Sequence, residues 1–214
     1  GDTVATTYEI STASSRSFNS VKSDRSGTPT AVVTENQVAY KTGDLSGMKS
    51  NLGMAIKINT DPVDEFLDTL SGVIFKQVVF ELGEIESVPE GQNPPSSFVA
   101  YFTDDTNEIL TRSDGQPITV QRDGLPQTEE DESGQILPSF NAPAIARYNQ
   151  NENIYRLGIT SYLNAVFRGE ILNRDWLLYG NSPETTGDDF KRSFRQFKVR
   201  DNNIKVRVIY SKIR

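Results

Sequence analysis

The most regular pattern of apolar and polar positions in the chain begins at Asp61. The Asp61-Pro62 pair is typical of a helix start, because a short polar side chain accepts free N–H groups and proline lacks the N–H that would stay unbonded. Asp64 stands where a capping box places a side chain that reaches back. The apolar positions recur at the spacing of one helix face, and they are Val63, Phe66, Leu67 and Leu70. This pattern predicts a short helix that buries Phe66 and Leu67 against a sheet.

Residues 73–82 then change to a period of two. One side of this pattern carries Ile74, Val78, Phe80 and Leu82, and the other carries Phe75, Gln77, Val79 and Glu81. Such alternation is typical of a strand with one buried face and one mixed face. We therefore expect a long strand directly after the helix.

Shorter runs of the same kind predict further strands at residues 31–40, 54–58, 98–103, 108–111, 118–122, 145–148, 154–157 and 176–179, with a weaker candidate at 3–10. A second short helix is predicted from Thr160, with Gly169 as its stop signal. Residues 123–138 contain four consecutive acidic residues from Glu129 and are expected to form a solvated loop. At the end of the chain, residues 194–200 and 204–213 are predicted to pair as a hairpin, with Ile204, Val206, Val208 and Tyr210 facing inward.

Many short strands with only two short helices predict an all-β, mainly antiparallel fold. We expect one domain over residues 1–214, a jelly-roll-like β-sandwich decorated by two short helices. Residues 1–30 are rich in Ser and Thr and are expected to form a peripheral strand and loop.

Composition excludes several kinds of site. The chain has no cysteine and no histidine, so disulfides, zinc–thiolate sites and a Ser-His-Asp triad are all excluded. No cofactor is expected, and calcium is the one metal ion that the remaining oxygen ligands suit. No apolar run approaches the roughly 20 residues that cross a bilayer.

Charge is distributed unevenly along the chain, whose net charge is −7. From Lys191 to the end there are nine basic residues and one acid, Asp201, which leaves 13 basic and 28 acidic residues, a net charge of −15, in the first 190 positions. The overall acidity argues against nucleic acid as a partner. Lys198, Arg200, Lys205 and Arg207 form the candidate basic site of the predicted hairpin. They either bind an anionic partner or pair with acidic side chains of the same molecule, and we favour internal pairing.

Other side chains allow a functional and a structural interpretation. Trp176 could stack on a sugar ring, but its compact apolar run favours a place in the core. Asp104, Asp105, Asn107 and Glu108 resemble a calcium loop in composition but lack its spacing, which favours a hairpin turn. The carboxylate pairs Glu84 with Glu86 and Asp188 with Asp189 could serve a glycosidase, but nothing marks them as buried, which favours a solvated face.

Several segments together resemble a known family: VIFKQVVFEL, Asn93-Pro94-Pro95, Asp104-Asp105, YRLGITSYLNAVFRGE, WLLYG and IKVRVIYSKIR. Over roughly residues 43–214 the chain resembles the C-terminal half of a family of Bacteroidetes surface lipoproteins of unknown function. The resemblance implies secretion and an N-terminal lipid anchor as the only membrane contact, although the anchoring cysteine is absent from this chain. It supplies no active-site residues.

Residues and resemblance together lead to an expected function that is not catalytic. We expect binding, adhesion or assembly at a bacterial cell surface, with a glycan or another surface protein as partner. The alternative is a carbohydrate-active enzyme that uses paired carboxylates.

Overall fold

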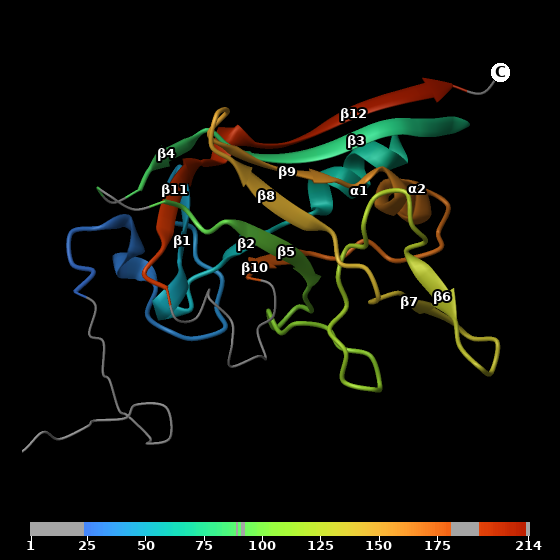
Figure 1. Cartoon of the computed structure of the whole chain (residues 1–214), viewed down its shortest axis with the longest axis horizontal. Helices are drawn as coiled ribbons and strands as arrows, with labels where there is room; N and C mark the ends of the chain where they lie inside the picture. Colours follow the sequence, from blue (N-terminus) through green and yellow to red (C-terminus); the bar gives the residue numbers. More distant parts are fainter. Residues whose placement is uncertain (1–23, 89, 91–92, 181–192, 213–214) are drawn as a thin grey trace, which may run out of the picture.

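The computed structural model describes residues 24–88, 90, 93–180 and 193–212, and within them every pairing between strands is antiparallel (Figure 1). The largest sheet has seven strands, in the order β12 (Ile204–Lys212), β3 (Val73–Gly83), β9 (Ile154–Gly158), β8 (Ile145–Asn149), β5 (Ser97–Phe102), β10 (Trp176–Tyr179) and β2 (Ile56–Ile58). A three-stranded sheet follows the order β1 (Leu45–Lys49), β11 (Gln196–Arg200) and β4 (Ile85–Ser87). A small separate hairpin consists of β6 (Thr128–Glu130) and β7 (Ile136–Pro138).

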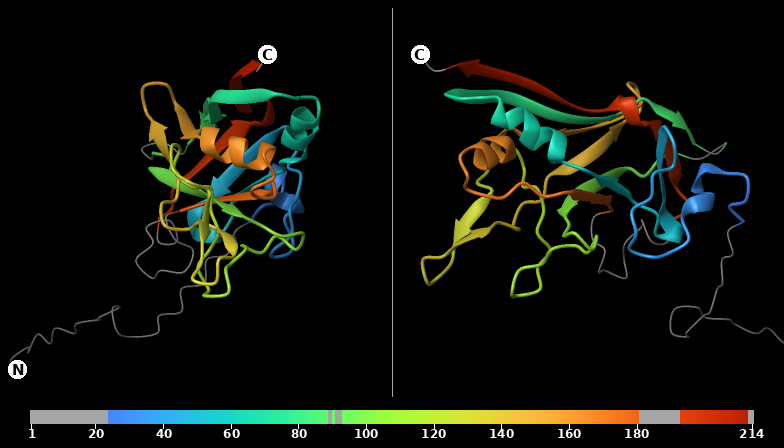
Figure 2. Two further views of the ribbon diagram at one scale, coloured as in Figure 1. Left: turned by 90° about the vertical axis from the view of Figure 1, so that its right-hand side faces the viewer. Right: turned by 180° about the vertical axis from the view of Figure 1, so that it is seen from behind.

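The large sheet curls until its two ends face each other, and this makes two layers from one sheet (Figure 2). Phe80 of β3 meets Trp176 of β10 edge to face, with ring centroids 5.6 Å apart. Trp176 also meets Tyr162 at 5.4 Å, which brings the helix α2 (Thr160–Phe167) into the same core. The predicted all-β, mainly antiparallel β-sandwich with two short helices is confirmed.

A bulge in β3 changes which side chains face the core. Ile209 of β12 lies opposite Gln77 and Tyr210 lies opposite Phe75, so Lys76 is an extra residue in β3. One extra residue reverses the inward and outward alternation beyond it. The prediction holds at Phe80 and its neighbours but is wrong before the bulge, where Phe75 is 2% exposed and Ile74 is 43% exposed.

The first helix, α1 (Asp61–Asp68), lies where the apolar spacing predicts it. Its capping differs from the prediction, because the backbone carbonyl of Thr60 accepts the N–H of Val63 at 2.8 Å and neither Asp61 nor Asp64 makes a capping hydrogen bond. Leu67 is buried as expected, whereas Phe66 is only half-buried against the core. The helix therefore contributes to the core mainly through Leu67.

The second helix, α2, is capped by a side chain from a distant loop. Asp123 accepts hydrogen bonds from the N–H of Ser161 and the hydroxyl of Thr160, both at 2.8 Å. At the other end, the N–H of Glu170 bonds to the carbonyl of Ala165 and the N–H of Gly169 to that of Val166, both at 2.9 Å. Gly169 has the positive φ of 71° that this helix ending requires. The predicted stop at Gly169 is confirmed.

The cap at Asp123 predicts a dependence of stability on pH. Burial raises the pKa of this carboxyl, but the hydrogen bonds from Ser161 and Thr160 outweigh burial and lower the pKa. A lowered folded-state pKa stabilises the fold above the unfolded-state pKa, and this stabilisation is lost as the pH falls through the folded-state pKa. We expect Asp123→Asn to cost about 1 kcal/mol of unfolding free energy near pH 7. In urea melts, the difference between parent and variant should shrink towards acid pH, and an equal difference at all pH values would contradict the assignment.

Two predictions differ from the structure: the strand expected at residues 31–40 and the solvated loop expected within residues 123–138. Residues 31–40 contain no strand: a 3₁₀-helix spans Pro29–Val32, and Val32 and Val38 stay 48% and 46% exposed with no neighbouring strand to pair with. The acidic segment expected to be a solvated loop contains β6 and β7 instead. Glu129 holds it in place by an ion pair with Arg112 and a 2.7 Å hydrogen bond from Asn141. The candidate strand at residues 3–10 lies outside the described residues.

The predicted C-terminal hairpin is also wrong, because β11 and β12 belong to different sheets. A 3₁₀-helix at Asp201–Asn203 separates them, and together they run antiparallel to the continuous segment formed by β4 and β3. Val199 lies opposite Ile85 in the small sheet, and Ile204 lies opposite Leu82 in the large one. The paired segments β4–β3 and β11–β12 therefore pass together from the small sheet into the large one and connect the two sheets.

Candidate functional site

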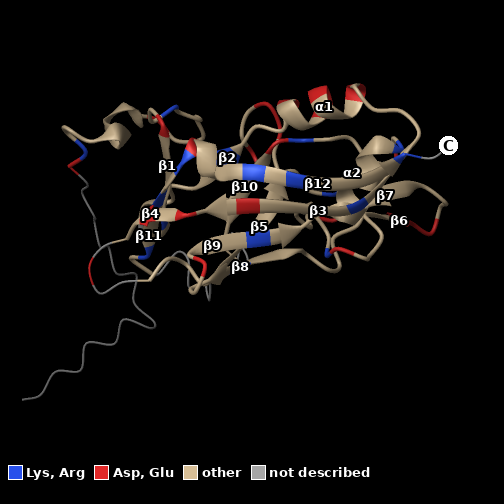
Figure 3. Ribbon diagram, turned by 90° about the horizontal axis from the view of Figure 1, so that it is seen from above, with Lys and Arg blue, Asp and Glu red and all other residues tan. Residues whose placement is uncertain are grey.

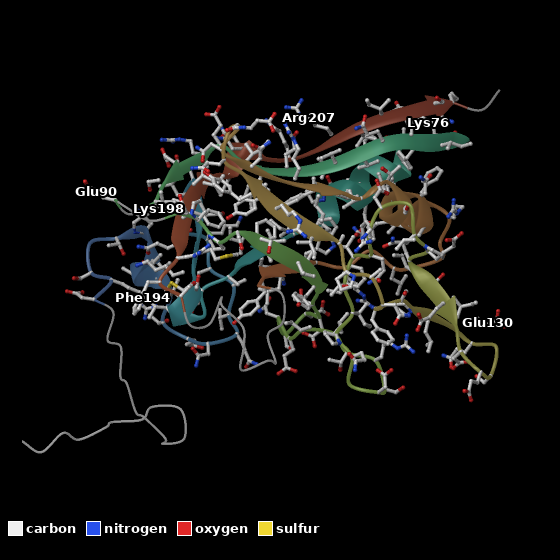
Figure 4. All side chains as sticks on the ribbon, in the orientation of Figure 1. Lys76, Glu90, Glu130, Phe194, Lys198 and Arg207 are labelled. Carbon is white, nitrogen blue, oxygen red and sulfur yellow. The ribbon has the colours of Figure 1, made fainter. Side chains whose placement is uncertain are left out.

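The four basic residues singled out in the sequence do not form one patch. Lys198 and Arg200 lie on β11 in the small sheet, whereas Lys205 and Arg207 lie on β12 in the large sheet. Lys198 and Arg207 are accordingly well separated in Figure 4. Arg200 pairs with Glu86 at 2.5 Å and with Asp44 at 3.3 Å, which confirms internal pairing for this residue.

Trp176 is a core residue. Its side chain is 2% exposed and its ring contacts Phe80 and Tyr162 edge to face. A sugar cannot reach the face of such a ring, so the interpretation of Trp176 as core is confirmed and it leaves the set of binding candidates.

The outer face of the large sheet carries charged residues on neighbouring strands, and Figure 3 shows basic and acidic positions side by side on the ribbon of β12 and β3, seen from above. Strand register places Arg147 of β8 opposite Arg156 of β9, Arg156 opposite Glu81 of β3, and Glu81 opposite Lys205 of β12. Arg207 joins this row diagonally, because its Nε lies 2.6 Å from Oε2 of Glu81. We call Arg147, Arg156, Lys205 and Arg207 the cationic row.

Glu81 anchors the cationic row. Its side chain is 8% exposed, and its two carboxylate oxygens accept hydrogen bonds from the Nε atoms of Arg207 at 2.6 Å and Arg156 at 3.1 Å. The hydrogen bond from Arg207 is the largest cause that lowers the pKa of Glu81; burial opposes it, and Arg156 lowers the pKa further. A buried carboxylate needs such partners, so the two guanidinium groups are held at fixed positions on the sheet.

The row carries more positive than negative charge. Its four cations face two carboxylates, Glu81 and Glu152, the second of which pairs with Arg156 and is the main cause that raises the pKa of that guanidinium. Arg147 and Lys205 make no ion pair with any residue that the structure describes. Two cations are therefore fixed by internal pairing, and two remain available to a ligand.

The sequence alone singled out only half of the cationic row. Arg147 and Arg156 lie in the predicted strands 145–148 and 154–157, at positions that alternate outward, but nothing in the sequence placed these strands beside β3. Strand order and register are the missing information, because a shift of one residue would turn both side chains to the other face.

Within the described part of the chain, the calcium-loop candidate and the carboxylate pair form no catalytic or metal site. Asp104 to Glu108 form a hairpin turn: Oδ1 of Asp104 accepts the N–H groups of Thr106 at 2.8 Å and Glu108 at 3.0 Å. The described residues hold no group of three or more acidic side chains that suits a metal ion. Glu84 and Glu86 are exposed, and Glu86 is engaged by Arg200; Asp188 and Asp189 lie outside the described residues.

Comparison with known proteins gives no assignment. The chain matches no protein family, no curated protein and no solved structure. None of the helices in the described segments is both long enough and apolar enough to span a bilayer.

Proposed function

We propose that this protein is a non-catalytic binding protein of a bacterial cell surface, where it serves adhesion or assembly, and that the cationic row is its binding site. The observation that carries the proposal is a row of four cations on the outer face of the sheet, two of which the buried carboxylate of Glu81 holds in place. The resemblance to Bacteroidetes surface lipoproteins supports the cellular location, with a lipid anchor upstream of this chain.

The shape of the row favours an extended anionic ligand. Neighbouring strands lie about 4.8 Å apart, so four strands spread the cations over roughly 14 Å of the outer sheet surface. An acidic polysaccharide presents charges along a similar length and needs no deep pocket. Guanidinium groups suit such a ligand because they bind carboxylate and sulfate oxygens through two parallel hydrogen bonds. The proposed ligand class is therefore an acidic glycan.

The test removes the two cations that have no internal partner. We expect the double variant Arg147→Gln with Lys205→Gln to bind immobilised heparin, used as a model acidic glycan, about tenfold more weakly than the parent at low salt, because exposed charge contacts contribute up to about 1 kcal/mol each. Retention of the parent should decrease as salt rises. Thermal unfolding of the variant should match the parent, since neither side chain holds an ion pair with a described residue.

A matched control distinguishes the loss of the cationic row from a general loss of positive charge. Arg122→Gln with Lys198→Gln removes one arginine and one lysine from exposed positions outside the row. Retention of this control should equal that of the parent. Equal weakening of both double variants, or no retention of the parent, would contradict the proposal.

A further inference from the structure

A lysine, an asparagine and an aspartate meet at one end of three neighbouring strands, none of which carries a residue of the cationic row. Lys57 lies on β2, Asp175 directly precedes β10, and Asn107 lies in the turn that follows β5. The Nζ atom of Lys57 is 2.6 Å from Oδ1 of Asn107 and 3.0 Å from Oδ2 of Asp175. The side chains of Lys57 and Asp175 are 22% and 25% exposed, so the group is shielded over most of its surface.

The carboxylate of this group has a fixed position. Its Oδ1 accepts the N–H of Thr60 at 3.0 Å, and the backbone carbonyl of Asp175 accepts the N–H of Thr103 at 2.9 Å. Thr60 and Thr103 are 3% and 2% exposed, and the next residue is the core side chain Trp176. The carboxylate is thus held from the core side, and its Oδ2 is directed at Lys57.

The amide of Asn107 is held from the opposite side. Its Nδ2 donates a 2.7 Å hydrogen bond to the carbonyl of Gln37, and its backbone N–H bonds to the carbonyl of Asp104 at 3.1 Å. The backbone of Asn107 has a positive φ of 65°, and Oδ1 of its side chain accepts the hydrogen bond from Lys57. Amine, amide and carboxylate are therefore positioned by three separate segments of the chain.

We propose that Lys57 and Asn107 become joined by an isopeptide bond, with Asp175 as the group that moves the protons. A nucleophile within hydrogen-bond reach of both its target and an oriented base is the arrangement that covalent chemistry between side chains requires. The Nζ atom lies 2.6 Å from Oδ1 of Asn107, so a small rotation of either side chain brings it to the amide carbon that is bonded to this oxygen. The modification does not depend on the function proposed for the cationic row.

The reaction balances without any other reactant. Asp175 takes a proton from the Lys57 ammonium group, and the neutral Nζ attacks Cγ of Asn107 to give a tetrahedral intermediate. Asp175 then passes its proton to Nδ2 while Nζ loses a further proton; the Cγ–Nδ2 bond breaks, and the new Nζ–Cγ bond remains as an amide. Ammonia leaves as the only product and takes up the displaced proton. Asn107 also lines a surface cavity with Gln37, Glu108 and Leu177, which offers ammonia a way out.

This bond would give the fold a covalent tie. It would join β2, the edge of the large sheet, to the turn after β5 and across β10, which lies between them. The chain has no cysteine and so has no disulfide to do the same. A cross-link of this kind stabilises a fold mainly by restricting the unfolded chain.

The test is the intact mass of the purified full chain. We expect a mass lower than the sequence mass by one molecule of ammonia. Tandem mass spectrometry of a tryptic digest should give one branched peptide that joins the segments around Lys57 and Asn107, with no cleavage after Lys57. A cooperative thermal transition will show that the parent is folded. If the folded parent has the full sequence mass, the proposal is wrong.

Variants distinguish formation of this bond from other reactions that release ammonia, such as cyclisation of an asparagine. Lys57→Arg keeps the positive charge but cannot form the bond, and Asp175→Asn removes the proton carrier; each should have the full mass of its own sequence. Lys76→Arg, at an exposed lysine on β3, should keep the deficit. A deficit that persists in Lys57→Arg would overturn the assignment, and the branched peptide of the parent tests it even where a variant fails to fold.

Discussion

Gly83→Ala is expected to destabilise the fold by about 4 kcal/mol, because it combines a steric overlap with backbone strain. A Cβ atom at this position would lie 2.5 Å from Cγ2, 2.7 Å from Cβ and 2.8 Å from Cα of Ile154. The last of these is a backbone atom of the paired strand β9, so no rotation of a side chain relieves the overlap. Gly83 also has a φ of 146°, which L-amino acids rarely adopt.

Urea unfolding of parent and variant measures this effect. Gly115→Ala is a suitable control, since Gly115 has a φ of 81° but open space where its Cβ would lie. The control should lose only the strain contribution, about 1 kcal/mol. Similar losses in the two variants would show that the close approach of Gly83 to Ile154 is not important.

Trp176→Ala is expected to cost about 3–5 kcal/mol of unfolding free energy. The indole is the largest fully buried side chain and stands between the two layers of the curled sheet, where it contacts Phe80 and Tyr162. Alanine would leave a cavity at the centre of the core, and the aromatic pairs would be lost with it.

The comparison for this variant is Leu172→Ala, which removes an apolar side chain that is 71% exposed. It should change stability by less than about 0.5 kcal/mol. Midpoints of thermal unfolding that shift equally in the two variants would contradict the central place of Trp176.

The spacing of apolar residues located helices and strands correctly where one segment of the sequence is enough to identify the element. The strands at 98–103, 145–148, 154–157 and 176–179 lie close to β5, β8, β9 and β10, because alternation and β-branched or aromatic residues identify a strand without its neighbours. Hydrophobic spacing also located both helices. The bulge at Lys76 was not predictable, since it arises from the register with β12.

Non-local pairing explains the remaining errors. The segment Asp201–Asn203 has the composition of a tight turn, and the same residues suit a 3₁₀ corner that sends β11 and β12 into different sheets. The candidate sites also depend on contacts between segments that are distant in the sequence. The cationic row joins four strands, and the group of Lys57, Asn107 and Asp175 comes from segments that lie 50 and 68 residues apart in the sequence.

The pairing of β12 with β3 has a consequence for a chain that is made from its N-terminus. Ile204 follows its partner Leu82 by 122 residues, so β3 is synthesised long before the strand that covers its outer edge. Until then the apolar segment of β3 has an unpaired edge, which is a template for pairing with other chains. Release of a chain that stops before Ile204 would leave this edge open permanently. Nascent or truncated chains are therefore the species in which aggregation through β3 should begin, and the arrival of β12 ends that period.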